Sequence, residues 1–431
     1  MITMKHQGAR PHRRASRVSF IGLLLGFLAS TPATNAQPVI GSPPAAQLVP
    51  ASMRQIADTG PKPSSSTNTA PPLRSGGSDR TSPFSWGPFS LHPYFSERFL
   101  YSDGLQARPG RPSNSYINTL SPGFRVDFGK NWTASYGANW AVYTNRAFKE
   151  SLDHAVNVAG TLAHKSWTAH FSQGYATSTA PMIETGRQTG QEGVSTSFGV
   201  TKIFDRRFSV SSTVGQNLQF ITSAPDNYTW TTDHSLHYRR SARLGGAIGV
   251  GAGYVDMDPG VNMAYVRPNA QISWTPSEKL TFSAQGGENI QQIYSRGVSA
   301  KYTPVFNVSG QYKPFQYTSV SLTAGRTVSP SVLRNQVNDS TTWSTGFTQR
   351  FLKHFNVSGN YGETDSGYSA TNERVTGGRR DKSYNYGLRL GTTFLKRGSI
   401  GLLYQGTHNG SNATGFGFDS TQTGVEVGYR Y

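Results

Sequence analysis

The sequence predicts an all-β protein: a transmembrane antiparallel meander β-barrel of about eighteen strands, preceded by a signal peptide and a disordered Pro-rich leader. Three observations predict this fold class. Apolar and polar residues alternate along most of the chain, short and long connections alternate between these segments, and the last strand has apolar residues at every second position. Period-two alternation places successive side chains on opposite faces of a strand, as a wall between lipid and water requires.

The N-terminal 36 residues have the organisation of a secretory signal peptide. Five basic residues precede or adjoin an apolar run over 18–29, which is too short to cross a bilayer as a helix. Small residues around Ala36 form an acceptable cleavage site. We therefore expect residues 1–36 to be removed and the mature chain to be exported.

The leader over 37–93 contains eleven of the 24 prolines, among many Ser and Gly residues. Such a composition cannot bury enough apolar surface to offset the entropy lost on ordering. We expect this segment to be disordered and the barrel to occupy 94–431.

Composition narrows the function classes. Only 35% of residues are hydrophobic, whereas 12% are aromatic and 47 are glycine, a balance that favours β-structure with one polar face. The chain contains no cysteine, which excludes disulfides, thiolate metal sites and cysteine nucleophiles.

The connections between the alternating segments predict a meander with two unlike ends. Short basic turns recur about every 38 residues from 129 to 397, and the intervening connections are longer and more polar. Eight short turns join sixteen strands, and a lead-in strand near 94–101 and a closing strand at the C-terminus bring the count to about eighteen. A secreted β-helix or adhesin is the rival fold, but its coils are shorter and lack the aromatic residues that cluster here beside the short turns.

Three prolines fall inside predicted strands: Pro122, Pro268 and Pro304. Each removes a backbone N–H that would donate a hydrogen bond to the neighbouring strand, which predicts breaks or register shifts in three strands.

The C-terminal strand ends "GVEVGYRY", with Val425, Val427, Tyr429 and Tyr431 on one face. This pattern resembles the C-terminal targeting signal of bacterial outer-membrane β-barrels. The resemblance implies insertion into outer-membrane lipid by the barrel-assembly machinery. By overall layout, residues 94–431 also resemble uncharacterised β-barrel porin families associated with exopolysaccharide loci, a likeness of pattern rather than of a sharp motif.

No catalytic, metal or cofactor site is predicted. The sequence Asp233-His234-Ser235 contains triad residue types, but alternation places His234 on the lipid face and its two neighbours inside, so the three cannot hydrogen-bond together. The formal net charge of +18 invites a nucleic-acid partner, which the signal peptide argues against.

Basic residues dominate the face predicted to line the lumen, where they outnumber the acids Asp127, Asp233 and Glu426. Those expected to set selectivity are Arg125, Arg207, Arg239, Arg243, Arg267, Lys313, Arg350 and Arg389. Rings of Arg and Lys favour anions. The alternative is that those near the short turns extend their charged groups to the membrane edge or pair with neighbouring acids.

The sequence therefore predicts an outer-membrane channel for passive diffusion or export of anionic solutes. A polysaccharide or its fragments as cargo is implied by the family resemblance alone. The alternative is a non-conducting structural or assembly barrel of a surface-polysaccharide machine.

Overall fold

The structure is a computed structural model that describes residues 84–431 except 223, 296–298, 353, 372–377 and 396. The chain divides into two units, residues 1–42 and 43–431, and only the second contains described residues. The predicted signal peptide and most of the predicted leader lie outside the described residues. No helix in the described part of the chain is long and apolar enough to cross a membrane.

Twenty-one strands make up the described secondary structure. They are β1 (Phe84–Trp86), β2 (Phe89–Arg108), β3 (Arg111–Phe128), β4 (Trp132–Tyr143), β5 (Ser151–His164), β6 (Trp167–Ser178), β7 (Pro181–Met182), β8 (Arg187–Gln188), β9 (Gln191–Ile203), β10 (Phe208–Ile221), β11 (Asp226–Arg239), β12 (Leu244–Asp258), β13 (Met263–Ser277), β14 (Leu280–Ile293), β15 (Lys301–Tyr312), β16 (Thr318–Pro330), β17 (Gln336–Phe351), β18 (Phe355–Ala370), β19 (Arg379–Phe394), β20 (Gly398–Ser411) and β21 (Phe418–Arg430).

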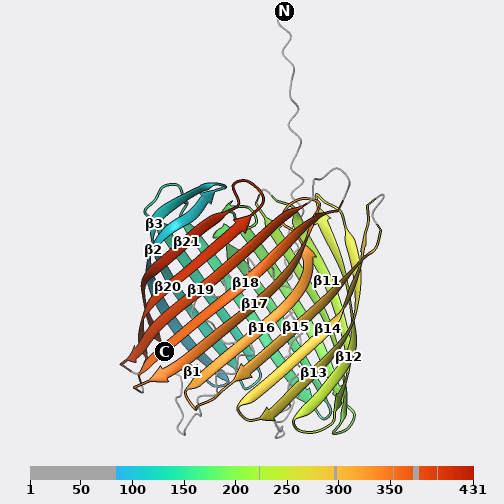
Figure 1. Cartoon of the computed structure of the whole chain (residues 1–431). Coiled ribbons are helices and arrows are strands. Elements are labelled where there is room, and N and C mark those ends of the chain that lie inside the picture. Colours follow the sequence, from blue (N-terminus) through green and yellow to red (C-terminus); the bar gives the residue numbers. More distant parts are fainter. Residues whose placement is uncertain (1–83, 223, 296–298, 353, 372–377, 396) are drawn as a thin grey trace, which may run out of the picture. The chain divides into compact units, whose positions relative to one another are not determined.

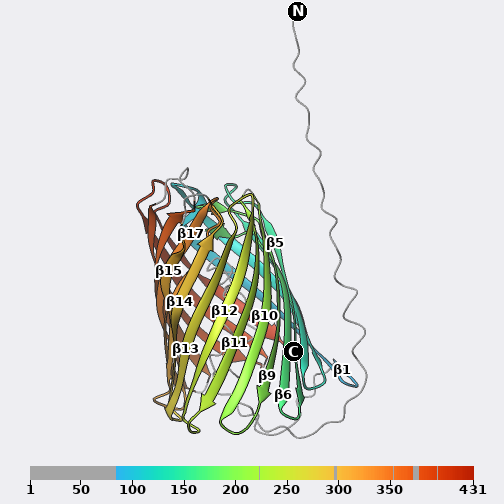
Figure 2. The same cartoon turned by 90° about the vertical axis from the view of Figure 1, so that its right-hand side faces the viewer.

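One antiparallel sheet of nineteen strands closes on itself, because β2 pairs with β21 as well as with β3. The closing pairs run from Tyr94↔Arg430 to Asp103↔Thr421. The short β1 pairs only with the start of β2, just before the residues of β2 that pair with β21. It is therefore not part of the closed ring, which has eighteen strands, as predicted. Closure removes both sheet edges, so each strand of the ring has a neighbour on either side, which a wall inside lipid needs. Figures 1 and 2 show the tilted strands of this barrel from two sides.

The two ends of the barrel differ, as the connections predicted. Tight turns such as the one that joins β13 to β14 lie at the end that carries the C-terminus (Figure 1), and the longer connections lie at the other end. The longest, residues 179–190 between β6 and β9, contains the small β7–β8 hairpin. The connection between β2 and β3 is only Pro109 and Gly110, but its strands are 20 and 18 residues long. Strand structure also begins at Phe84, inside the range predicted to be leader.

The outer face is apolar and the inner face is polar. Large exposed side chains at every second position of the wall include Ile248, Leu322, Leu388 and Leu402. Aromatic residues form a belt beside the tight turns: Phe89, Phe128, Trp132, Trp167, Phe208, Tyr238, Trp274, Phe351, Phe355, Phe394, Tyr429 and Tyr431. Rings at this level suit the boundary between lipid tails and headgroups.

The three prolines expected to disrupt strands leave those strands unbroken, so this prediction was wrong. β3, β13 and β15 each run through their proline. Pro122 stays opposite Phe95 of β2 and Pro268 stays opposite Val250 of β12, although pairing on the other side skips both prolines. Pro304 stays opposite Glu288 of β14. A proline removes one donor, and therefore disturbs at most one of the two ladders that its strand forms.

Candidate solute pathway and its mouth

The inner wall is lined mainly by Ser, Thr, Asn, Gln and Gly. On β12 the inward positions include Gly249, Gly251 and Gly253. The glycines make room for neighbouring side chains. A Cβ at Gly251 would lie 2.5 Å from Asp233 Oδ1 and 3.7 Å from Arg267 Nε, so this glycine lets an acid and a base project over the backbone of β12.

Arg389, one of the predicted selectivity residues, belongs to a charged triad at the closing seam. Its Nη2 lies 3.2 Å from Glu426 Oε1, and Arg98 Nη2 lies 2.9 Å from Glu426 Oε2. The side chains of Arg98 and Glu426 are only 15% and 12% exposed. Within this triad, one carboxylate is shared by two guanidinium groups.

The other predicted lining residues divide into two groups. Arg125 pairs with Asp127 at 2.7 Å, and Asp127 also meets His92, so the positive charge there is offset. The second group lies at or next to the tight turns: Arg207, Arg239, Arg243, Lys313 and Arg350. The structure therefore places three predicted residues, Arg125, Arg267 and Arg389, on the inner wall beside acids, and five at the rim.

The residues of Asp233-His234-Ser235 lie on alternating faces of β11. Asp233 projects over Gly251 of the inner wall, whereas His234 is exposed and makes a 3.0 Å hydrogen bond with Thr232 Oγ1. In the described part of the chain, no group of three or more His, Asp or Glu side chains is arranged to hold a metal ion.

Two segments reach across the end of the barrel that carries the longer connections. The first is the mouth loop, residues 179–190. The second is the tip hairpin, residues 327–337, where β16 stays paired with β17 after its pairing with β15 has ended at Arg326. Val337 of the tip hairpin belongs to one buried hydrophobic cluster with Met263 and Tyr265 of β13, although β14, β15 and β16 lie between β13 and β17 around the wall. Such contacts require the tip hairpin to lean into the barrel.

The mouth loop meets the tip hairpin from the opposite wall. Seven strands, β10 to β16, separate β9 from β17 around the ring. Met182 of the mouth loop nevertheless belongs to one buried hydrophobic cluster with Val332 of the tip hairpin and Ile221 of β10. Glu184 accepts hydrogen bonds from the Val332 N–H at 3.1 Å and from Asn338 Nδ2 at 3.2 Å. The two segments thus form one layer across the mouth.

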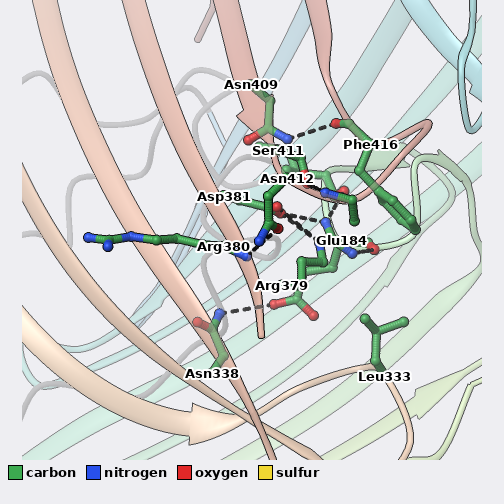
Figure 3. Close-up of polar contacts among 12 residues, drawn as sticks. Glu184, Leu333, Asn338, Arg379, Arg380, Asp381, Asn409, Ser411, Asn412 and Phe416 are labelled. Atoms are coloured by element: carbon green, nitrogen blue, oxygen red, sulfur yellow. Dashed lines mark hydrogen bonds and ion pairs between the residues drawn. The ribbon is translucent and has the colours of Figure 1, made fainter. Parts of the chain in front are cut away.

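Arg379, at the start of β19, ties the mouth loop to this strand (Figure 3). Its guanidinium donates to the Glu184 carbonyl oxygen at 2.8 Å and pairs with Asp381 through Nε at 3.0 Å. The guanidinium carbon of Arg379, Cζ, lies 3.8 Å from the centre of the Phe416 ring and 4.8 Å from the centre of the Tyr368 ring. The Arg379 and Asp381 side chains are 8% and 3% exposed, so this ion pair is shielded from water and salt.

The Glu184 carboxyl has a perturbed pKa. Burial raises the pKa of Glu184, and the hydrogen bond from the Val332 N–H and the charge of Arg379 oppose that rise. The backbone of the mouth loop also lies close to β2 at Gly186. This glycine has φ +61°, and a Cβ there would lie 3.2 Å from Gln106 Oε1 of β2.

Sequence reasoning missed Arg98, Glu184, Arg379 and Asp381. Alternation shows which side chains face inward, but it does not show which loop folds into the barrel.

The predicted assembly residues lie where the alternation placed them. Val425, Val427, Tyr429 and Tyr431 are 37%, 43%, 37% and 45% exposed on the outer face. The Tyr431 ring lies 6.1 Å from that of Phe84 in β1, and the Arg397 guanidinium lies 4.9 Å from the Tyr431 ring centre. Their role in assembly stays a prediction.

A closed ring, an apolar outer face, a polar inner face and two unlike ends define a transmembrane β-barrel of the bacterial outer-membrane type.

No protein-family model matches the chain, and no curated protein matches its sequence. Among solved structures, the chain is similar to the outer membrane protein OpdK from Pseudomonas aeruginosa, with 13% identity over 79% of this chain and 98% of that chain and a TM-score of 0.41. It is also similar to OccK2 (OpdF) from Pseudomonas aeruginosa, with 10% identity, 79% and 98% coverage and a TM-score of 0.44. A third similar structure is OccAB3 from Acinetobacter baumannii, with 10% identity, 79% and 99% coverage and a TM-score of 0.42.

Proposed function

We propose that this chain is an outer-membrane channel through which small anionic solutes diffuse passively. The observation that carries the proposal is the triad of Arg98, Glu426 and Arg389 on the inner wall. Its surplus guanidinium charge lies on a wall that is otherwise mostly uncharged and polar. Positive charge that lines a water-filled pore raises the local concentration of anions and lowers that of cations.

The rim supports the same preference. Arg207, Arg239, Arg243, Lys313 and Arg350 lie at the tight-turn end, and no described carboxylate forms an ion pair with any of them. Their charges attract anions toward that opening. Because they are exposed to salt, their effect is more strongly screened than that of the triad.

A polysaccharide or its fragments remains the cargo suggested by the likeness to exopolysaccharide-associated porin families. The proposal needs only that the solute is anionic. Because Arg binds carboxylate and phosphate groups in a bidentate manner, uronic acids and small organic acids are both candidates.

The contacts across the mouth favour a second candidate function, a non-conducting barrel that serves as a structural or assembly partner. The Glu184 hydrogen bonds hold the mouth loop against the tip hairpin, and the Arg379 side chain ties the same loop to β19 through the Glu184 carbonyl oxygen. A mouth held closed in this way would give a plugged barrel.

Planar-bilayer recording of the refolded protein tests these alternatives. We expect stable step conductances in KCl, with a reversal potential across a KCl gradient that shows anion preference. The absence of steps under all conditions, from protein whose folding is shown by heat-modifiable migration on gels, would favour the non-conducting barrel.

A further inference from the structure

A cavity of about 460 Å³ lies among the described loops of the mouth. Six connections contribute to its wall: those between β2 and β3, β6 and β9, β10 and β11, β12 and β13, β16 and β17, and β20 and β21. A solute that enters from this end would meet the cavity before the inner wall. Its volume is in the range of small-molecule sites.

Most of the cavity wall is apolar. Pro109, Pro225 and Pro259 come from three different connections, and Leu333 and Phe416 add an aliphatic side chain and a ring. Proline side chains carry no donor and lose little entropy when a ligand packs against them. The wall therefore suits a compact apolar body and offers few partners to a hydroxyl-covered sugar, whose groups would be left without hydrogen bonds.

Two arginines complete the wall, Arg187 on β8 in the mouth loop and Arg334 in the tip hairpin. Both are exposed. In the part of the chain that the structure describes, neither forms an ion pair with a carboxylate, whereas Arg379 pairs with Asp381 and Arg326 pairs with Asp339. Arg379 and Arg326 are thus neutralised, whereas the two arginines on the cavity are not.

We propose that this cavity binds small organic monoanions that combine an apolar body with one carboxylate. The apolar body packs against the prolines, Leu333 and Phe416, and the carboxylate is held by Arg187 and Arg334. The proposal deepens the proposed function, on which it rests, by naming the substrate class that the mouth admits. It disfavours both inorganic anions, which gain nothing from an apolar wall, and neutral sugars, which gain nothing from the arginines.

The docked mouth loop is what assembles the cavity. Glu184 is hydrogen-bonded to the Val332 N–H, so the loop that carries Arg187 is fixed against the hairpin that carries Arg334. Arg379 holds the same loop by the Glu184 carbonyl oxygen. The two guanidinium groups therefore line one cavity only while these contacts persist.

Binding to the full-length mature protein, refolded in detergent, tests the site without a membrane. Isothermal titration calorimetry with cyclohexanecarboxylate is compared with its neutral amide, cyclohexanecarboxamide, and with acetate, which keeps the charge but lacks the ring. We expect the acid to bind at least tenfold more tightly than either. The double variant Arg187→Gln/Arg334→Gln should lose that advantage, and Arg146→Gln, an exposed arginine of the β4–β5 connection outside the cavity, should keep it.

Equal affinity of acid and amide, equal affinity of cyclohexanecarboxylate and acetate, or an unchanged double variant would each overturn the site. Bilayer conductance is recorded on the same preparations. Selective binding without conductance would uphold the site and reject the channel, and conductance without selective binding would uphold the channel and reject the site.

Discussion

At the scale of single residues, one carboxylate determines how much charge the inner wall displays. Glu426 is shared by Arg98 and Arg389, and its burial keeps solvent from screening either pair fully. Removing an arginine leaves a neutral pair, and removing the acid leaves two uncompensated cations. Substitutions at the triad should therefore move ion selectivity in opposite directions.

Replacing Arg267, Arg350 and Arg389 together by Gln should lower anion preference without unfolding the barrel, because positions on the inner wall and at its rim tolerate neutral polar residues. Arg389→Gln alone should have part of this effect, and Glu426→Gln should raise anion preference. Reversal potentials across a KCl gradient measure each change, with Arg146→Gln as a control that removes the same charge from an exposed connection. A shift of the same sign for Arg389→Gln and Glu426→Gln would show that the triad does not control selectivity.

At the scale of elements, the mouth loop is stabilised in its docked position by contacts that respond to pH. The carboxyl of Glu184 faces Arg379, Asp381 and Tyr368 across the mouth and the tip hairpin beside it. Its pKa is raised above the ordinary value of 4.5 in the docked state. A docked loop that holds the proton more tightly than a released loop becomes more stable as pH falls through the raised pKa, and gains nothing more below 4.5.

Lowering the pH from 7 toward 5 should therefore favour the docked loop and reduce the conductance of the wild-type protein. Glu184→Gln imitates the protonated side chain and still accepts from Val332 N–H and Asn338, so its conductance should be low throughout this range. Glu150→Gln, which changes an exposed carboxyl in the β4–β5 connection, is the matched control. A Glu184→Gln variant that retains the full pH response would assign that response to another group.

The terminal strand gives a second prediction at this scale. Tyr431 packs against Phe84 and Arg397 at the tight-turn end, where the barrel closes. Deleting Tyr431 should slow or prevent assembly, because the alternating apolar pattern of the last strand loses its final member. Heat-modifiable migration of the outer-membrane fraction measures assembly, and normal migration of the deletion variant would count against a targeting role.

Features of these elements were predictable from the sequence where they depend on residues close together in the chain, and not where they depend on residues far apart. Period two predicted the outward Val427 and the inward Glu426, because alternation is a local property of a strand. The count of eighteen followed from the spacing of tight turns. The contact between Glu184 and Val332 was not predictable, since it joins segments 148 residues apart whose own sequences show only that they are polar connections. Strand continuity at Pro122 and Pro268 depends in the same way on the neighbouring ladders, which local propensity does not describe.

At the scale of the whole molecule, the distribution of charge separates a shielded mouth from an exposed channel. Arg379 and Asp381 are excluded from water, so salt does not screen the pair that positions the Arg379 guanidinium against the mouth loop. The inner-wall and rim arginines face the aqueous path instead. Salt should therefore leave the mouth layer in place while it screens the potential that selects ions.

The salt dependence of selectivity follows from this separation. A surplus of guanidinium groups holds a positive potential over roughly the Debye length, about 10 Å at 0.1 M salt and about 3 Å at 1 M. Anion permeation should thus exceed cation permeation at 0.1 M KCl and approach equality near 1 M, since at 1 M the screened charges no longer reach the centre of a barrel of this strand number. Reversal potentials at a fixed concentration ratio, recorded at several mean salt concentrations, measure the trend. A preference for cations at low salt, or an anion preference that does not weaken at 1 M, would mean that the inner-wall charge is not what selects the permeating ion.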